Sequence, residues 1–244
     1  RLIDLPGAGA EATAPATALA VQQAARLELD NFSLLVAHVR VLPAMQAIMQ
    51  NERTEVEGFL AAGHVCTVEG HRDYDAFVER FGCPVVVTGF EPVDLLCGIL
   101  ACVRQIEDGA PRVENCYPRS VNAGGNLHAR NLVSEVYEVC DRNWRGIGSI
   151  GGGGLRLRPQ WSRFDAGDRF VREQSVAKVD CRCRAGEVLT GQIKPSQCEF
   201  FGTECTPASP LGAPMVSSEG ACAAYYQYAH ATVPPAEPGI EKSP

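Results

Sequence analysis

The chain has 244 residues, of which 45% are hydrophobic and 21% charged, and this composition is typical of a globular protein. Its formal charge is −7, which argues against nucleic acid or an acidic membrane surface as the main partner. The longest nearly continuous apolar run, 95–103, is too short to span a bilayer, and no cleavable signal is visible. The arrangement of the cysteines, described below, leads us to expect a cytoplasmic protein.

Residues 1–142 alternate between strand-like and helical patterns. The short apolar runs predict buried strands at 32–39, 58–65 and 84–88. The stretches with helical spacing predict helices at 43–50, 73–81, 92–106 and 127–139. This order predicts an α/β domain over 1–142, with a parallel sheet flanked by helices.

The glycine-rich stretch 145–158 marks a change in the pattern. Its alternation predicts a β-ribbon, and we assign 143–180 to a connector of this kind. A phosphate-binding loop is disfavoured because no helix follows the glycines to receive the phosphate. We assign 181–229 to a loop-rich cysteine segment. The proline-rich tail, 230–244, is predicted to be disordered.

Eleven cysteines are an unusual number, and an odd count cannot form a fully paired disulfide framework. Six lie in apolar text, where a thiol behaves as a small buried hydrophobe, and we expect all of them in the core: Cys66, Cys83, Cys97, Cys102, Cys116 and Cys140. The other five crowd into 181–222, which indicates a metal site rather than a disulfide scaffold.

Four of these five are candidate ligands: Cys183, Cys198, Cys205 and Cys222, separated by 14, 6 and 16 residues. Four soft thiolates suit an iron–sulfur cluster or structural zinc. Zinc ribbons usually supply their ligands as close pairs, which these are not, so the spacing leaves both metals open. Disulfides are a distant third alternative, and Cys181 is left over as a spare thiol.

The sequence around the cysteines contains recognisable motifs. It includes GEVLTG at 186–191, Lys194–Pro195 and MVSSEGACAAY at 215–225. Three further blocks lie upstream, at 13–18, 63–70 and 89–96, the last two containing GHV and GFEP. On these motifs the chain resembles the HypD family, which matures nickel–iron hydrogenases, over about residues 11–229.

The resemblance implies one 4Fe–4S cluster on Cys183, Cys198, Cys205 and Cys222, with Cys181 dispensable. It implies a scaffold with a redox role, rather than an enzyme, for assembling an iron that carries cyanide and carbon monoxide. The implied partners are a small HypC-like chaperone and a HypE-like cyanide donor. Two alternatives stay open, namely a plain iron–sulfur electron carrier and a structural zinc module on an α/β domain.

The resemblance also implies that the sequence is N-terminally incomplete. The family carries an early iron-holding cysteine and a dithiol motif, GPGCPVC, that are not found here. Cys83–Pro84–Val85 resembles a piece of that motif but lacks the second cysteine, so we expect Cys83 in the core. We expect the chain alone to carry its cluster without holding the cyanide-bearing iron.

Several polar residues are candidates for the cleft implied by the family. His64 and Glu91 are expected at the same, C-terminal edge of neighbouring strands, where open α/β sheets bind ligands. For Asp94, charge at a helix start is the preferred explanation. Glu219 either bonds backbone amides near a cluster ligand or faces the cleft. His38 is expected to be structural.

Overall fold

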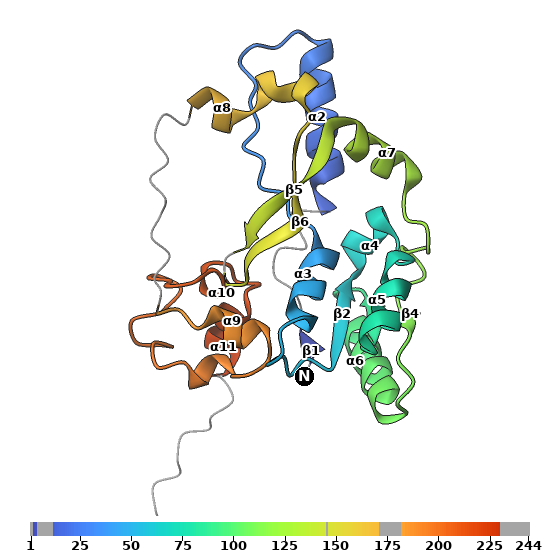
Figure 1. The fold of residues 1–244 in the computed structure, drawn as a ribbon, viewed down its shortest axis with the longest axis vertical. Coiled ribbons are helices and arrows are strands. Elements are labelled where there is room, and N and C mark those ends of the chain that lie inside the picture. The colour runs from blue at the N-terminus through green and yellow to red at the C-terminus, as the bar shows by residue number, and fades with distance from the viewer. Residues whose placement is uncertain (1, 4–11, 145, 171–181, 230–244) are drawn as a thin grey trace, which may run out of the picture.

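The computed structural model describes residues 2–3, 12–144, 146–170 and 182–229. Four parallel strands form a sheet in chain order, namely β1 (Leu2–Ile3), β2 (Gly58–Ala62), β3 (Val85–Thr88) and β4 (Val113–Asn115) (Figure 1). The predicted strands at 58–65 and 84–88 are confirmed as β2 and β3, although β2 ends at Ala62. Mixed α/β architecture with a parallel sheet flanked by helices is therefore confirmed.

Helices cover both faces of β3. Because successive strand residues point to opposite faces, Val85 and Val87 enter one core while Thr88 faces the other way. The first core is built with α3 (Val41–Met49), α4 (Gly63–Glu69) and α5 (Asp73–Phe81). On the opposite face lies α6 (Pro92–Glu107), whose Gly98 meets the Thr88 side chain. The predicted helices at 43–50, 73–81 and 92–106 are confirmed as α3, α5 and α6.

Residues 32–39 do not form the predicted strand. They make only isolated bridges, Leu34 to Asp165 and Val39 to Gly154. The side chains of Phe32, Leu34 and Val36 pack on a second core, so the apolar pattern reports burial without sheet pairing. That core also holds α2 (Ala14–Arg26), a helix that the sequence analysis missed.

A long antiparallel hairpin follows the sheet. The predicted helix at 127–139 ends at Val136, as α7 (Leu127–Val136), because Tyr137 takes extended backbone and pairs with Leu157. The hairpin consists of β5 (Tyr137–Trp144) and β6 (Gly148–Leu157), so the glycine-rich stretch is a strand. After it come a 3₁₀ turn, η1 (Pro159–Phe164), and α8 (Ala166–Phe170).

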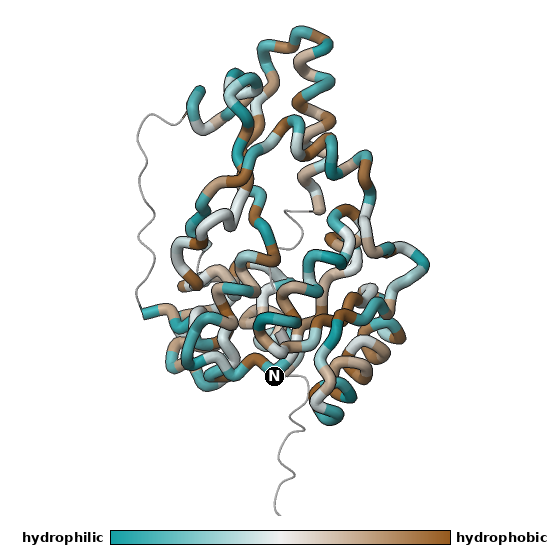
Figure 2. Tube along the Cα trace, turned by 45° about the vertical axis from the view of Figure 1, so that its right-hand side comes forward, coloured by the Kyte–Doolittle hydropathy of each residue, from teal (hydrophilic) through white to brown (hydrophobic). Residues whose placement is uncertain are grey.

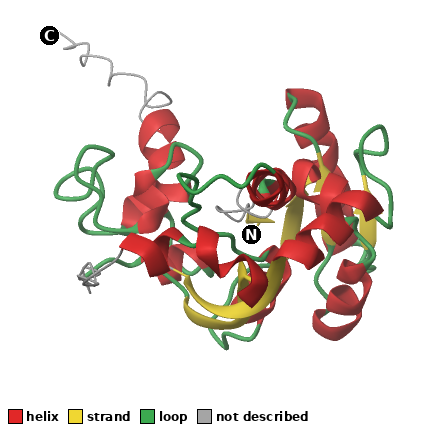
Figure 3. Cartoon of the chain, turned by 90° about the horizontal axis from the view of Figure 1, so that it is seen from above, coloured by secondary structure: helices red, strands yellow, loops and turns green. Residues whose placement is uncertain are grey.

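The cysteine segment contains α9 (Ala185–Leu189), η2 (Pro195–Gln197), α10 (Ala213–Val216) and α11 (Ala221–Ala229). It lies on the other side of the molecule from α4 and α6 (Figures 1 and 3). The predicted disordered tail, 230–244, lies outside the described residues. In the part of the chain that the structure describes, no helix is both long and apolar enough to cross a membrane.

Candidate metal centre and sheet-edge site

Four cysteines from separate parts of the C-terminal segment line one pocket. Cys183 precedes α9, Cys198 follows η2, Cys205 lies in the next loop and Cys222 is in the first turn of α11. The free volume between these side chains is about 20 Å³, which is room for about one water molecule. The structure thus brings together all four residues of the expected ligand set. Cys181 lies outside the described residues.

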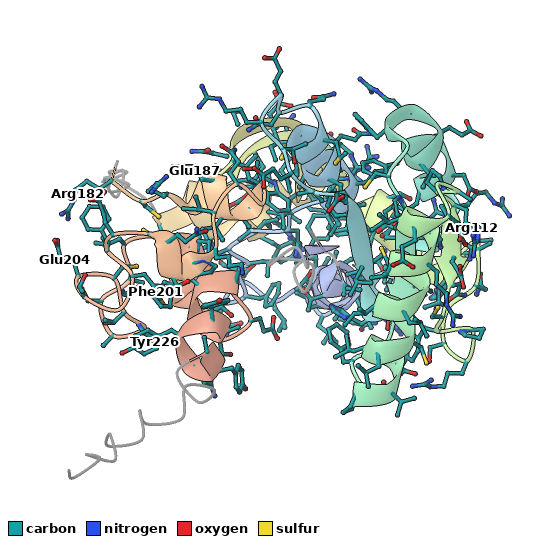
Figure 4. All side chains as sticks on the ribbon, turned by 90° about the horizontal axis from the view of Figure 1, so that it is seen from below. Arg112, Arg182, Glu187, Phe201, Glu204 and Tyr226 are labelled. Carbon is teal, nitrogen blue, oxygen red and sulfur yellow. The ribbon has the colours of Figure 1, made fainter. Side chains whose placement is uncertain are left out.

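Apolar side chains form the wall of this cysteine pocket. Ala185, Val188 and Met215 line it, and Phe201 adds an aromatic side. Tyr226 on α11 packs against the Phe201 ring with the centroids 5.9 Å apart (Figure 4). The wall therefore keeps water from the sulfur atoms on this side.

The backbone approaches two of the sulfurs closely. A Cβ atom on Gly212 would collide with Cys183 Sγ, so only glycine leaves that sulfur its place. The neighbouring Leu211 N–H donates a hydrogen bond of 3.5 Å to Cys205 Sγ. Hydrogen bonds of this kind stabilise negative charge on a thiolate and tune the potential of a bound centre.

Burial and neighbouring thiols shape the electrostatics of the pocket. Burial, together with the nearby thiols of Cys205, Cys183 and Cys198, raises the pKa of Cys222 to about 12. Arg184 also lines the pocket, and its guanidinium donates a hydrogen bond to each carboxylate oxygen of Glu187, at 2.8 and 2.5 Å. Among the described residues, no three His, Cys, Asp or Glu side chains are gathered tightly enough to hold a single metal ion.

The C-terminal edge of the sheet holds the second candidate site. Ala62 pairs with Thr88 in parallel register, so β2 and β3 end at the same level. His64 and Glu91 follow these ends and therefore lie at one edge. His64 is in the first turn of α4, rather than in the strand as predicted, and its ring lies 4.9 Å from that of Phe90.

An arginine that the sequence analysis missed binds both acidic residues of this edge. Arg119 donates to Asp94 Oδ1 at 2.9 Å and also contacts Asp94 Oδ2, and it lies 3.1 Å from Glu91 Oε2. The guanidinium holds the pKa of Asp94 below its ordinary value. Asp94 is therefore an ion-pair partner of Arg119, in addition to its place at a helix start.

Tyr117 was also missed, and its ring fills the space beside two motif glycines. A Cβ atom on Gly63 or on Gly89 would lie 2.6 Å from the ring. Arg119 stacks on the same ring at 4.3 Å from its centroid. We define the sheet-edge site as His64, Phe90, Glu91, Tyr117 and Arg119. The sequence analysis could not identify Tyr117 and Arg119, because the loop after β4 that contains them carries no motif. Only the fold brings them to this edge.

Two other candidates lie elsewhere. Glu219 is exposed in the turn between α10 and α11, where its N–H bonds Ser217 Oγ. It belongs to the cysteine segment, on the other side of the molecule from His64. His38 is buried, with Nε2 2.7 Å from Thr17 Oγ1 and its ring against Tyr137, so its structural role is confirmed.

The six cysteines outside the segment are not all in the core. Cys66, Cys83 and Cys102 are buried as predicted, and burial raises the pKa of Cys83 to about 12 and of Cys102 to about 11. For Cys97 the prediction is wrong, because it lies on the outward face of α6 and is exposed. Cys116 and Cys140 are half-buried.

Comparisons with known proteins place the chain in a family. The family model HypD, described as the hydrogenase formation hypA family, matches residues 5–229. The chain is 42% identical to hydrogenase maturation factor HypD2 of Bradyrhizobium diazoefficiens, 44% to HypD of Rhodobacter capsulatus and 43% to HypD of Escherichia coli. Each alignment covers 90–91% of this chain and 60% of the relative. The chain thus spans about 60% of the length of these relatives.

Proposed function

We infer that this chain, which belongs to the HypD family, acts as a hydrogenase maturation factor. Its proposed role is that of a scaffold and redox partner, rather than an enzyme, in assembling the iron centre of nickel–iron hydrogenases. The observation that carries the proposal is the pocket lined by four cysteines that come from four separate elements.

The donor set fits a 4Fe–4S cluster. Such a cluster binds each thiolate at a different iron, so its ligands lie further apart than those of one zinc ion, whose tetrahedral Zn–S bonds are about 2.3 Å. Four thiols that come from separate elements around one pocket suit the wider arrangement. The proposed ligands are Cys183, Cys198, Cys205 and Cys222.

When bound, the cluster would supply or accept single electrons. The protein's own groups set the conditions for this. Phe201 and Tyr226 keep water away from one side of the sulfurs, and the Leu211 N–H stabilises charge on Cys205. Both effects shift a reduction potential. Arg184 adds positive charge beside the pocket, moderated by its fork onto Glu187.

The sheet-edge site is proposed to receive the iron that carries cyanide and carbon monoxide as its cargo. His64 is exposed there and offers a ring nitrogen, and Glu91 and Arg119 offer charge of both signs. Glu219, in the cysteine segment, stays a candidate for bonding near the cluster. A small HypC-like chaperone and a HypE-like cyanide donor are the proposed partners, on the basis of the family.

The test is anaerobic purification followed by measurement of iron, acid-labile sulfide and zinc per chain. We expect close to four irons and four sulfides with broad visible absorption, because four thiolates suit a cubane cluster. Stoichiometric zinc with no visible absorption would contradict the proposal. Cys97→Ser is the matched control for each ligand variant, since Cys97 is exposed and lies on α6, away from the pocket.

A further inference from the structure

A larger pocket lies between α3, the tip of the β5–β6 hairpin and α9. Its free volume is about 440 Å³, compared with about 20 Å³ between the four cysteines. Small-molecule sites enclose about 300–1,000 Å³. The hairpin tip lies beside α3 and reaches the cysteine segment (Figure 1). We call this space the α3–α9 pocket, and it is large enough to hold a small molecule.

Backbone contacts fix the walls of the α3–α9 pocket. On one side the hairpin tip packs directly on α9, because a Cβ atom on Gly186 would lie 2.7 Å from the Gly146 carbonyl oxygen. On the other side the Glu55 N–H donates a hydrogen bond of 2.9 Å to the Thr190 carbonyl oxygen, just after α9. The walls are thus positioned before any ligand arrives.

The lining of the pocket divides into an apolar and a polar part. Ile48, Ile147 and Ile150 form the apolar part, and Ile48 and Ile150 are almost completely buried. After Ile48 the trace changes from the hydrophobic end of α3 to the hydrophilic residues 50–53 (Figure 2). This division suits a ligand that has an apolar body and a polar head.

The polar part offers hydrogen-bond donors. Asn51 Oδ1 accepts the Arg53 N–H at 2.9 Å, which leaves the Asn51 amide nitrogen as a donor. Ser149 adds a hydroxyl group. Among the residues that the structure describes, no side-chain hydrogen bond or close ion pair engages the Arg53 guanidinium. The head of the ligand is therefore expected to be an acceptor.

The charges around the pocket favour an anion. Arg184 binds both carboxylate oxygens of Glu187 and, with a smaller contribution from Arg53, lowers the pKa of Glu187. The negative charge of Glu187 is thus balanced by Arg184, and the positive charge of Arg53 is left over. A guanidinium presents two parallel donors, which match the two oxygens of a carboxylate.

We propose that the α3–α9 pocket binds a small organic carboxylate, with the carboxylate at Arg53 and the carbon chain against the three isoleucines. The helix α9 links this ligand to the cysteine pocket. Gly186 and Glu187 line the α3–α9 pocket, whereas Ala185 and Val188 of the same helix line the cysteine pocket. A ligand that holds one side of α9 therefore stabilises the wall of the other pocket.

Three probes of similar shape test the preference for charge. They are 3-phenylpropanoate, its neutral amide and 3-phenylpropylamine, each titrated into the anaerobically purified chain and followed by ligand-observed NMR. We expect the acid to bind with a dissociation constant on the order of 1 mM and the amide about tenfold more weakly, because charge-assisted hydrogen bonds are the stronger ones. An acid that shows no saturable binding, an amide that binds as well as the acid, or an amine that binds better overturns the proposal.

The variant Arg53→Gln separates a binding role from a structural one. It should weaken binding of the acid about tenfold and leave the affinity for the amide unchanged, because only the charge-assisted contact is lost. Arg104→Gln, which replaces an exposed arginine on α6, is the matched control and should bind both probes like the wild type. Unchanged binding of the acid to Arg53→Gln, or an equal loss of acid and amide, contradicts the assignment of Arg53.

Hydrogen exchange tests the link through α9. A saturating concentration of the acid should slow exchange at residues 185–189 more than the same concentration of the amide does, while α6 stays unchanged. Binding without slower exchange in α9 would place the ligand elsewhere and overturn the proposal. None of these measurements requires a bound cluster, so their failure would leave the proposed function standing.

Discussion

The two candidate sites rest on very different amounts of structure. The cysteine pocket is closed by four short helical elements of three to nine residues, over a local core with three buried side chains, Cys205, Met215 and Ala223. The sheet-edge site stands on parallel strands whose core holds fifteen buried residues. Short helices are marginal without tertiary support. We therefore expect the pocket to depend on a bound metal for folding and the sheet edge to fold without one.

Removing one ligand gives the largest expected difference between the two regions. Cys198→Ser should abolish iron binding, and because a metal site contributes its binding energy to folding, residues 182–229 should lose protection against hydrogen exchange. Strands β2 and β3 should stay protected. Exchange measured by mass spectrometry on the variant and on Cys97→Ser checks both statements. Equal loss of protection in the strands would show that the two regions fold as one.

A substitution in the pocket wall should have a smaller effect. Gly212→Ala forces a methyl group against Cys183 Sγ, and overpacking of this kind costs about 1–3 kcal/mol. We expect iron per chain to fall by more than half and the cysteine segment to unfold at lower denaturant. Gly124→Ala is the control, because a Cβ atom there meets nothing closer than 3.7 Å. Full iron loading in Gly212→Ala would place Cys183 outside the ligand set.

At the sheet edge we expect an effect of pH. Arg119 holds the folded-state pKa of Asp94 below its ordinary value of about 3.9, so the pair stabilises the fold fully above that pH. This contribution is lost as the pH falls through the folded pKa. The gap in urea midpoint between wild type and Arg119→Met should therefore be larger at pH 7 than at pH 3. Arg156→Met, which removes an exposed pair with Glu138, should show no such trend.

The smallest effect concerns the unmodified chain, in which buried and exposed thiols should react at different rates. Thiolates react with iodoacetamide, and a raised pKa lowers their population at pH 8. Cys83 and Cys102, with pKa values of about 12 and 11, should be labelled only on unfolding. Cys97 is exposed and should be labelled first. Peptide mapping after timed labelling measures the order, and early labelling of Cys83 would contradict its burial.

The sequence predicted the sites to different depths. The four cysteines could be predicted because residue type and spacing are visible in the sequence itself, and because the surrounding motifs resemble those of a family. At the sheet edge, strand ends predicted His64 and Glu91. Arg119 and Tyr117 could not be predicted, because only the parallel pairing of β3 with β4 brings them to that edge. The strand predicted at 32–39 was wrong for a related reason. An apolar run indicates burial, but it does not show whether the run pairs with another strand.

Tyr117 also bears on how this family's sequences vary. Gly63 and Gly89 begin the GHV and GFEP strings, and both lie under one aromatic ring, where any side chain would collide with it. Each glycine also has a second close neighbour. A Cβ atom on Gly63 would lie 2.7 Å from the Thr88 carbonyl oxygen, and one on Gly89 would clash with Asp94 Oδ2. A smaller residue at the position of Tyr117 would therefore not make room for alanine, so a deep alignment should show glycine at both positions even in relatives that lack this tyrosine.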